Sequence, residues 1–385
     1  MVNNKIHVIE FLRPQDVFVE AHISDTHFGV IDPAKEFYIL KEQFLDYLYQ
    51  MKTLDIVSVN GDIFDRKLLA NSDAVMYAMY FVRTLIDICR LKNATLILIS
   101  GTGSHDADQL KLFTPFIGGD VDVRIVFQAQ FVFVKGKKIL CIPEMYNMGV
   151  NYYEDFLVHS GIYDACYMHG TFAGAIRGKD EPDLDSNREP VFEMQDFAMC
   201  NGPIIAGHNH INSVYKRDFY YCGSPIRWRF GEEQDKGFLI LLHNIKSKQY
   251  LIHFEPIQSF RYDTINLDSM LNSDPRYMIE RINRLKAQGV DHIRIKFTKN
   301  DSNKIALLRS YFNNDSNIKI DTNFEKQKIQ QELEQMDQKY QQYDYLFDDN
   351  MTSNDKLIKY INQQENSSYW TLDTFSSFIN QIKNL

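Results

Sequence analysis

The sequence predicts an α/β fold in which polar residues at the ends of several strands meet at one edge of a sheet. Apolar strand-like runs alternate with a helical pattern over residues 17–60, and this β-α-β order produces parallel strands. Five apolar runs are each followed at once by Asp, His or Gly. From Ser213 onward the pattern turns to hairpins, so we expect two sheets packed face to face with helices outside.

Five strand-end patches carry the candidate site. The first is Ser24-Asp25-Thr26-His27, directly after the apolar run 17–23. The other four, in chain order, are Asn60-Gly61-Asp62-Ile63-Phe64-Asp65, Gly103-Ser104-His105-Asp106, His169-Gly170 and Gly207-His208-Asn209-His210. Groups just past strand ends gather at one sheet edge, where α/β enzymes place their sites, so we expect the patches to converge.

The residue types in these patches are those of a metal centre. Asp and His without a nearby Cys form a ligand set suited to Mn, Fe or Zn. Asp25 and His27 are two residues apart, so on an extended segment they point the same way, and His208 and His210 repeat this spacing. Asp62 is a single carboxylate that could bridge two ions. Two cations about 3.5–4 Å apart would clamp the attacking and leaving oxygens of a phosphoryl group.

Each patch alone also has an ordinary structural explanation. A single His in a core is usually a hydrogen-bonded polar residue, and Gly-Asp after a strand is often only a turn. What favours the metal centre is that all five patches occur in one chain, each directly after a strand-like run.

In this order the motifs Asp-x-His, Gly-Asp-x-x-Asp, Gly-x-His-Asp, His-Gly and Gly-His-x-His resemble those of the calcineurin-like metallophosphoesterases. Three later elements, Tyr221-Cys222-Gly223-Ser224-Pro225, Phe230-Gly231-Glu232 and Lys236-Gly237-Phe238, are similar to the SbcD nuclease subunit of the SbcCD DNA-repair complex. Small phage recombination nucleases belong to the same group. The resemblance covers about residues 17–258. It implies a two-sheet metallophosphoesterase sandwich flanked by helices, with a small α+β capping domain and a C-terminal helical tail.

The resemblance also implies a role for each candidate residue, and two divalent cations as cofactors, with Mn²⁺ expected and Mg²⁺ as the alternative. The implied metal ligands are Asp25, His27 and His210 for metal one, Asp62 as the bridge, and His169 and His208 for metal two. His105 would stabilise the transition state or protonate the departing 3′ oxygen, with Asp106 orienting it. Asp65, Arg227 and Arg229 would contact substrate.

One motif departs from the family pattern. The third motif usually reads Gly-Asn-His-Asp, and its Asn binds the second metal, whereas here Ser104 stands at the Asn position of a longer loop. A neutral hydroxyl is a weaker metal ligand than an amide carbonyl. Three arrangements stay open: Ser104 coordinates, a water or another group fills in, or the second metal binds loosely.

Composition limits the functional classes. The 385 residues allow two or three domains, and the net charge of −9 argues against a general polyanion binder. A nuclease would offset this charge with bound cations and with the DNA grip of a partner subunit. Local basic residues, such as those of Arg227-Trp228-Arg229, would add to that grip.

The same composition predicts a cytoplasmic protein, in the host cytoplasm if a phage encodes it. No apolar run reaches the roughly 20 residues that span a bilayer, and the N-terminus lacks the form of a signal peptide. The five cysteines are scattered and stand in apolar contexts, so we expect free thiols.

Apolar spacing predicts the individual elements. Phe37, Leu40, Phe44 and Leu48 recur at helical intervals and indicate a helix over 33–51. The remaining expected helices and strands of the first 258 residues follow from the same periodicities. The helices are 72–92, 108–116 and 151–159, and the strands are 55–60, 95–100, 124–127, 131–134, 139–142, 165–168, 203–207, 214–216, 219–222, 237–243 and 250–256. The polar loop 174–190 is either a substrate-facing flap or merely exposed.

Three domains are expected: a nuclease domain over 1–258, a capping and DNA-contact domain over 259–323, and a linker with C-terminal partner-binding helices over 324–385. The middle part opens with a strand at 261–267, then reads helix, strand, helix, strand over 276–320, and its alternative role is a structural appendage. In the tail, four apolar residues at i, i+3, i+7 and i+10 form a helical stripe. They are Leu372, Phe375, Ile379 and Ile382.

That stripe needs a covering surface. By resemblance the surface is an SbcC-like SMC-type ATPase subunit, and the alternative is the body of the chain itself. The resemblance likewise implies a homodimer formed through the nuclease domain, and DNA as substrate.

We therefore expect a metal-dependent DNA nuclease, an exonuclease or endonuclease acting on phosphodiester bonds. Two alternatives stay open. One is a phosphatase or cyclic-nucleotide phosphodiesterase of the same fold. The other is a weakly active scaffold that binds DNA or the ATPase.

Overall fold

The computed structural model describes residues 17–148, 150–175, 190–216, 218–266, 275–297, 302–321, 351–364 and 371–383. Most of the polar loop 174–190, and the part of the expected linker before residue 351, lie outside these ranges. The chain divides into two compact units. The first comprises Met1–Asp263 and Leu285–His292, and the second comprises Thr264–Arg284 and Ile293–Leu385. Over the described ranges, no helix is both long enough and apolar enough to cross a membrane.

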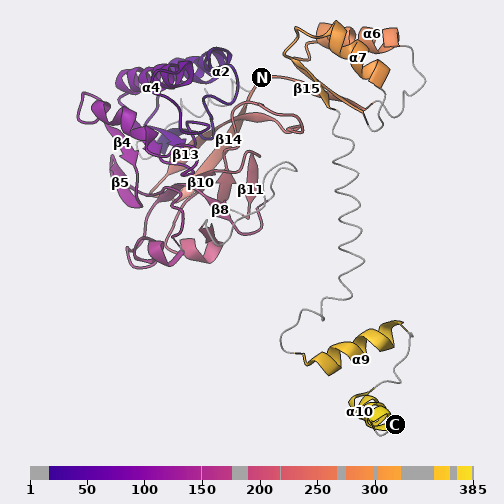
Figure 1. Cartoon of the computed structure of the whole chain (residues 1–385). Coiled ribbons are helices and arrows are strands. Elements are labelled where there is room, and N and C mark those ends of the chain that lie inside the picture. The colour runs from indigo at the N-terminus through magenta and orange to yellow at the C-terminus, as the bar shows by residue number, and fades with distance from the viewer. Residues whose placement is uncertain are drawn as a thin grey trace. The chain divides into compact units, whose positions relative to one another are not determined.

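The first unit has the predicted α/β class and contains two six-stranded sheets. The strands of the first sheet are β1 (Val17–Ile23), β2 (Ile56–Asn60), β3 (Thr95–Ile99), β4 (Val123–Val126), β13 (Lys236–Asn244) and β14 (Gln249–Ile257). Their order is β14-β13-β1-β2-β3-β4. Figure 1 labels β14, β13 and β4 of this sheet. β1 to β4 run parallel, and β13 and β14 extend the sheet antiparallel. The predicted parallel start is therefore confirmed.

The second sheet is also mixed. Its strands are β5 (Gln130–Val134), β6 (Lys137–Ile142), β7 (Ala165–His169), β10 (Ile204–Gly207), β11 (Ser213–Tyr215) and β12 (Phe219–Tyr221). Their order is β11-β12-β10-β7-β6-β5, and β6, β7, β10 and β12 run parallel. Each sheet therefore has a block of parallel strands whose carboxyl ends form one edge.

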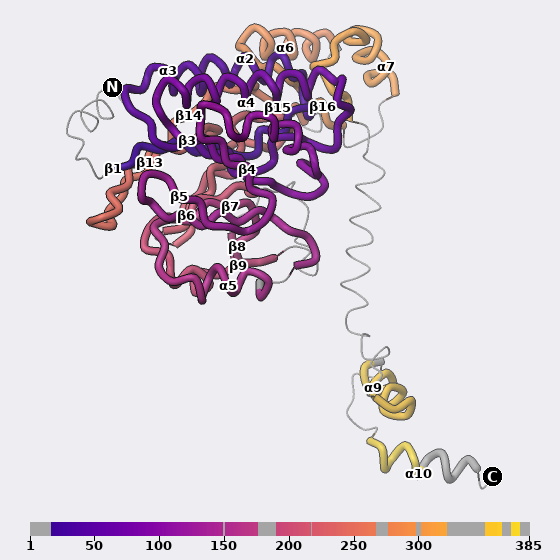
Figure 2. The backbone as a smooth tube through the Cα atoms, turned by 90° about the vertical axis from the view of Figure 1, so that its left-hand side faces the viewer, coloured from indigo at the N-terminus to yellow at the C-terminus, as the bar shows by residue number. Residues whose placement is uncertain are grey.

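Helices cover the outer face of the first sheet. They are α2 (Pro33–Leu40), a π-helical segment (Lys41–Leu45), α3 (Asp46–Gln50) and α4 (Asp73–Lys92), and Figure 2 shows α2 to α4 along one side of the unit. The Asp32 carboxylate caps α2, and the Ser72 hydroxyl caps α4. The apolar stripe predicted for 33–51 packs here, since Leu40, Phe44 and Leu48 are fully buried with the outward residues of β1, β2 and β3.

The two sheets share a buried apolar layer, so they pack face to face, as the sequence predicts. β1 shows how alternation divides it: Val19 and Ala21 face the helices, while Phe18 faces the second sheet. The layer joins residues of both sheets. It contains Phe18, Ile56, Ile97, Ile99, Val126, Val132, Val134, Ile139, Cys141, Ala165, Tyr167, Ile205, Cys222 and Leu239.

A buried charged group lies in this intersheet layer. Glu20 of β1 pairs with Lys137 of β6 and with the Tyr167 hydroxyl of β7, and Lys137 Nζ also donates to Tyr167 at 2.9 Å. All three side chains are fully buried. Near neighbours hold the pKa of Glu20 low, because Lys137 and His22 outweigh the opposing effect of burial. The pair therefore ties the two sheets together ionically.

His243 of β13 gives the first unit an acid-sensitive point. Burial, reinforced by the charge of Lys137, lowers the pKa of His243 to about 4. Between pH 6.5 and 4 the unfolded chain therefore binds a proton at this position that the folded chain does not. The contribution of the neutral His243 to folding stability is therefore complete above pH 6.5 and is lost as the pH drops toward 4.

We expect His243→Phe to flatten this dependence. Differential scanning calorimetry between pH 7 and pH 5 should show a smaller fall in Tm for the variant than for the wild type. The exposed His159 provides the matched control, and His159→Gln should keep the wild-type slope. An unchanged slope in His243→Phe would rule out this residue as the source.

The outer face of the second sheet carries short elements. They are two 3₁₀ helices (Val150–Tyr153 and Met194–Phe197), α5 (Glu154–Leu157), β8 (Thr171–Phe172) and β9 (Val191–Phe192). The helix expected over 151–159 is thus a 3₁₀ turn followed by one α turn. The helix expected over 108–116 is likewise a 3₁₀ helix, Gln109–Phe116, with Pro115 inside it. Proline removes the amide that an α-helical hydrogen bond needs.

The second unit has its own small elements. They are β15 (Tyr262–Asn266), α6 (Pro275–Ala287), β16 (His292–Lys296), α7 (Ser302–Tyr311) and β17 (Ile318–Asp321), followed by α9 (Ser353–Gln364) and α10 (Leu372–Lys383). The start of β15, the end of α6 and the first residue of β16 belong to the first unit. β15, β16 and β17 form a three-stranded sheet. α9 and α10 contact each other, and Ile358 and Phe375 are buried. Ile379 and Ile382 belong to α10, but their side chains lie outside the described set.

Candidate metal centre

The structure brings the strand-end patches together. Asp25 and His27 follow β1, Asp62 follows β2, His169 ends β7, and the segment His208–His210 follows β10. In the first sheet β1 pairs in parallel with β2, and in the second sheet β7 pairs in parallel with β10. The candidate ligands therefore come from the carboxyl ends of parallel neighbours in both sheets.

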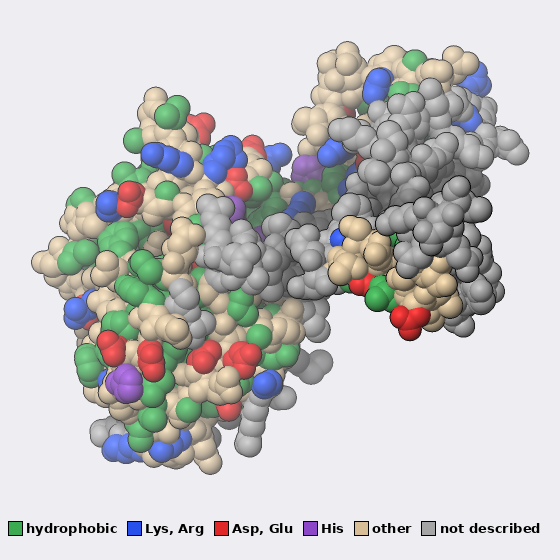
Figure 3. Space-filling model, turned by 60° about the horizontal axis from the view of Figure 1, so that its bottom comes forward, with side chains coloured by type: hydrophobic (Ala, Val, Ile, Leu, Met, Phe, Trp, Pro, Cys, Tyr) green, Lys and Arg blue, Asp and Glu red, His purple; other side chains and the backbone are tan. Residues whose placement is uncertain are grey.

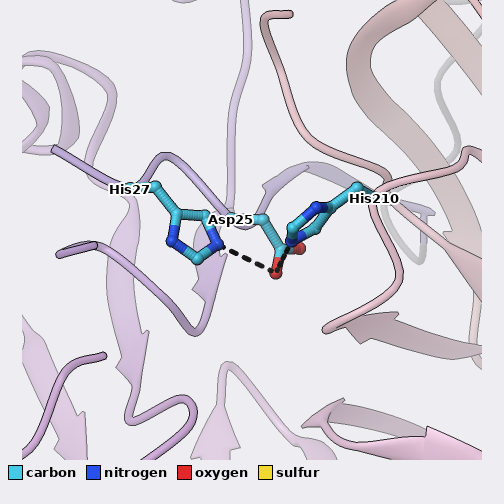
Figure 4. A group of neighbouring side chains, drawn as sticks. All are labelled: Asp25, His27 and His210. Atoms are coloured by element: carbon cyan, nitrogen blue, oxygen red, sulfur yellow. Dashed lines mark ion pairs between the residues drawn. The ribbon is translucent and has the colours of Figure 1, made fainter. Parts of the chain in front are cut away.

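Asp25, His27 and His210 form one group with the spacing of a metal site (Figure 4). His27 Nε2 lies 4.0 Å from Asp25 Oδ1, and His210 Nε2 lies 3.8 Å from the same oxygen. Figure 4 shows both imidazole rings directed toward the carboxylate of Asp25. These are the three residues expected at metal one.

Asp62 is shared between further groups. Its Oδ2 lies 3.7 Å from His27 Nε2 and 3.2 Å from His169 Nε2. Two groups of metal-site spacing contain it, one with His27 and His105 and one with Asp25 and His169. A carboxylate between two histidines of different groups has the position that a bridging ligand requires.

Glu144 is a member of the site that the sequence did not reveal. Its carboxylate joins His169 and His208 in a group of metal-site spacing. Glu144 follows β6, which is the parallel neighbour of β7. The strand 139–142 was predicted, but Pro143 and Glu144 follow it, so the stretch lacks the Asp, His or Gly by which the other patches were recognised.

The third motif is not arranged as its comparison with the family pattern predicts. Ser104 has an exposed side chain and belongs to none of the groups of metal-site spacing found among the described residues. Thr102, two residues earlier, is buried instead, and its Oγ1 lies 3.2 Å from Asp62 Oδ2 and 3.3 Å from His169 Nε2. Its amide also donates to Asp62 Oδ1 at 2.7 Å. The extra loop length therefore places Thr102, rather than Ser104, against the ligands.

His105 is partly buried and joins His27 and Asp62 in one group. One ring nitrogen, Nδ1, donates to the backbone oxygen of Asp65. In the neutral ring this leaves the lone pair on Nε2. His105 Nε2 is then the atom that can hold or transfer a proton.

Asp106 has a different partner from the one expected. Its carboxylate accepts hydrogen bonds from three backbone amides, those of Asp62, Phe64 and Gly101, at 2.8–3.0 Å. No hydrogen bond from it to His105 occurs in the described part of the chain. Asp106 therefore fixes the loops that carry Asp62 and the third motif.

Of the three residues expected to contact substrate, one lies at the ligand groups and two do not. Asp65 lies at the site, with Oδ1 3.9 Å from His27 Nδ1. Arg227 donates to the backbone oxygens of Glu232 and Gln234, so its guanidinium holds a turn. Arg229 Nε lies 3.8 Å from Glu232 Oε1 and outside the ligand groups.

Residues of the motif elements after β12 contact the backbone and the ring of His210. Lys236 Nζ donates to the backbone oxygen of His210 at 3.0 Å, to Ser224 Oγ at 2.7 Å and to Glu232 Oε1 at 3.2 Å. The ring of Trp228 packs edge-on against both His27 and His210, with centroids about 5 Å away. Such outer contacts orient metal-ligating imidazoles.

Backbone strain is concentrated at the site. Ten non-glycine residues of the described ranges have a positive φ, and four of them are candidate ligands: Asp25, His27, Asp62 and His208. This left-handed region costs a non-glycine residue free energy and persists where the surrounding structure enforces it, often at functional sites. The strain therefore marks the same residues as the motifs.

Two glycines allow the ligands to approach. Gly61 has a φ of +88°, and a Cβ there would collide with the His169 ring. A Cβ on Gly101 would collide with Asp62. Close approach of backbone to a ligand is a standard reason for glycine.

Burial sets the protonation states of the three side chains expected to bind metal one. It lowers the pKa of His27 to about 3 and the pKa of His210 well below its ordinary value. Both imidazoles are therefore neutral near pH 7, the form that binds metal. Burial also raises the pKa of Asp25 to about 6, which still leaves this carboxylate mostly ionised at neutral pH.

At the second group, neighbouring charges override burial. Burial raises the pKa of Asp62, but His169 outweighs it and keeps this pKa low. Burial likewise opposes ionisation of Glu144, but His208 and His169 lower its pKa. Both carboxylates are therefore ionised at neutral pH.

These residues fit divalent cations. His27 Nε2 and Glu144 Oε1 are buried and make no hydrogen bond to the described residues. Buried polar atoms of this kind are costly unless they are paired or bind a metal. The donor set is imidazole nitrogen with carboxylate oxygen, which suits Mn, Fe or Zn. All five cysteines are free thiols, and none belongs to a ligand group found in the described ranges.

No family model matches the chain, and no curated protein matches it. Among solved structures the chain is similar to AQ665 from Aquifex aeolicus, a protein of unknown function, with 19% identity and a TM-score of 0.24 over 50% of this chain and 80% of that chain. It is also similar to GAP50, the anchor in the inner membrane complex of Plasmodium, with 11% identity and a TM-score of 0.36 over 63% of this chain and 90% of that chain. The chemistry of the site therefore rests on its own residues.

Proposed function

We propose that the protein is a metal-dependent DNA nuclease that hydrolyses phosphodiester bonds at a two-cation centre. The observation that carries this proposal is the overlap of four His and carboxylate groups of metal-site spacing, two of which share Asp62. The motif resemblance to the calcineurin-like metallophosphoesterases, and within them to the SbcD nuclease subunits, supports phosphoester chemistry on DNA.

In this proposal Asp25, His27 and His210 hold one cation, and His169 and His208 hold the other, with Asp62 between them. The pair, when bound, would lower the pKa of an attacking water and neutralise charge on the phosphate oxygens. Thr102 and Asp106 keep Asp62 in place through hydrogen bonds. These contacts hold the shared carboxylate in a fixed position before substrate arrives.

His105 is the proposed proton donor. Its Nδ1–H donates to the Asp65 backbone oxygen, so when the ring carries its second proton, on Nε2, that proton can pass to the departing 3′ oxygen and leave the neutral ring. Asp65, at the rim of the same group, would steer the substrate.

The surface charge fits a nuclease that depends on its cations and on a partner for DNA binding. On the face of the first unit drawn in Figure 3, acidic and basic side chains are interspersed. The net charge of the whole chain is −9. Cations at the site would reverse the local charge that DNA meets.

The C-terminal helices are the proposed docking point for an SbcC-like ATPase. α9 and α10 bury Ile358 and Phe375, while Leu357, Tyr360 and Leu372 stay exposed. Exposed apolar side chains beside a small helical pair favour a partner surface. A homodimer formed through the first unit belongs to the same proposal.

The test is Mn²⁺-dependent digestion of linear duplex DNA, compared with hydrolysis of a small chromogenic phosphodiester and of a phosphomonoester. Each substrate is assayed with and without the partner ATPase. We expect DNA to be digested and His105→Ala to lower the rate by roughly 10²–10⁴-fold, the usual contribution of a general acid. Hydrolysis of the small esters without DNA digestion would point to a phosphatase or a cyclic-nucleotide phosphodiesterase. An unchanged rate in His105→Ala would refute the assigned role.

A further inference from the structure

Glu144 has the geometry of a ligand. Its Oε2 lies 3.0 Å from His208 Nδ1 and 3.6 Å from His169 Nε2. All three residues are placed by the ends of β6, β7 and β10, which are adjacent parallel strands. The positions are therefore fixed by the sheet rather than by a surface loop.

The second carboxylate oxygen of Glu144 also favours a role as a metal ligand. Glu144 is only 5% exposed, and its Oε1 is buried without a hydrogen bond to any described residue. Burying an ionised carboxylate is costly unless every oxygen is paired or bound to a metal. A cation between Glu144, His169 and His208 would supply that partner.

Neither hydroxyl of the third motif can take this role as well. Ser104 is exposed. Thr102 Oγ1 is within hydrogen-bond distance of both Asp62 Oδ2 and Glu144 Oε2, at 3.2 and 3.1 Å. Since a hydroxyl carries one proton, Thr102 can donate to only one of these two carboxylates at a time, and this hydrogen bond occupies its hydroxyl.

We propose that Glu144 is a ligand of the second cation and takes the place of the amide that the third motif lacks. The ligand set of that cation is then Asp62, Glu144, His169 and His208. An ionised carboxylate replaces a neutral amide, so the second site gains one negative charge. A charged oxygen ligand favours a hard cation such as Mn²⁺ or Mg²⁺. The second site is thereby a strong one, and the alternative of a loosely held metal is set aside.

This inference rests on the two-cation centre proposed above, but not on DNA as the substrate. The direct readout is the number of Mn²⁺ ions bound per chain, measured by electron paramagnetic resonance of free Mn²⁺ during titration. We expect two ions for the wild type and two for Ser104→Ala. Glu144→Ala should keep one ion at wild-type affinity and weaken the other by at least about 10–100-fold, the loss typical even of outer contacts.

Glu144→Gln guards against a folding defect, because it keeps the shape of the side chain and replaces the carboxylate by an amide. We expect this variant to bind two ions, the second more weakly than in the wild type and more tightly than in Glu144→Ala. Thermal unfolding without metal checks that both variants fold. Wild-type binding of both ions by Glu144→Ala, or loss of one ion in Ser104→Ala, would overturn the proposal.

The two proposals fail in different ways. If the wild type binds two Mn²⁺ ions and Glu144→Ala loses one, but linear DNA is not digested, the nuclease proposal fails and the assignment of Glu144 stands. If DNA is digested and Glu144→Ala binds both ions, the assignment fails alone. A wild type that binds fewer than two ions overturns the two-cation centre and the assignment of Glu144 together.

Discussion

Asp62→Asn should abolish metal-dependent hydrolysis while leaving the fold intact. Asp62 Oδ2 lies 3.7 Å from His27 Nε2 and 3.2 Å from His169 Nε2, so this carboxylate lies between the two sets of ligands. Replacing it by an amide removes the charge that both cations share, and metal catalysis contributes several kcal/mol to transition-state stabilisation, which corresponds to a fall of about 10³-fold or more. The rate of Mn²⁺-dependent cleavage of linear duplex DNA checks this.

Asp87→Asn is the matched control. Asp87 is half exposed on α4 and pairs with Arg83 and Arg90. Exposed ion pairs contribute about 0–1 kcal/mol, so this variant should keep full activity and nearly wild-type stability. Circular dichroism and Tm confirm that Asp62→Asn folds. Substantial metal-dependent cleavage by the folded Asp62→Asn protein would contradict the assignment.

Lys137→Met should have the largest effect on stability. The substitution keeps the length of the side chain but leaves Glu20 buried without its cation. Removing one partner of a buried ion pair typically costs about 3–5 kcal/mol. Urea unfolding at pH 7 should show this loss as a lower midpoint with an unchanged slope.

The double variant separates the lost partner from lost packing. Glu20→Gln with Lys137→Met removes both charges, so most of the lost stability should return. The Tyr167 hydroxyl can still bond to the new amide. If Lys137→Met is nearly neutral, or if the double variant is as unstable as the single one, the pair is not what joins the sheets electrostatically.

Much of this fold could be predicted from periodicity. The stripe Phe37, Leu40, Phe44 and Leu48 marked a helix that packs on the first sheet, and the parallel start follows from the β-α-β order. The two short helical stretches around Pro115 and Tyr153 differ from expectation, since apolar spacing alone does not separate an α-helix from a 3₁₀ helix.

The part of the candidate site that lies just past the strand ends could be predicted from the sequence. Asp25, His27 and Asp62 lie just past the ends of β1 and β2, so their convergence follows from strand order. Glu144 and Thr102 were not predictable in the same way. Glu144 lies as close to the end of its strand as Asp25 and Asp62 do, but Pro143 and Glu144 are not of the residue types that the pattern requires. Thr102 displaces Ser104 because the loop of the third motif is longer. Loop conformation depends on tertiary contacts, such as the three amides held by Asp106, that no local pattern contains.

The two-cation centre can be tested by anomalous diffraction from crystals of the protein grown with Mn²⁺. We expect two strong peaks in the first unit. One should lie among Asp25, His27 and His210, and the other among His169, His208 and Glu144, with Asp62 touching both. A single peak, no peak, or peaks away from these residues would contradict a two-cation centre.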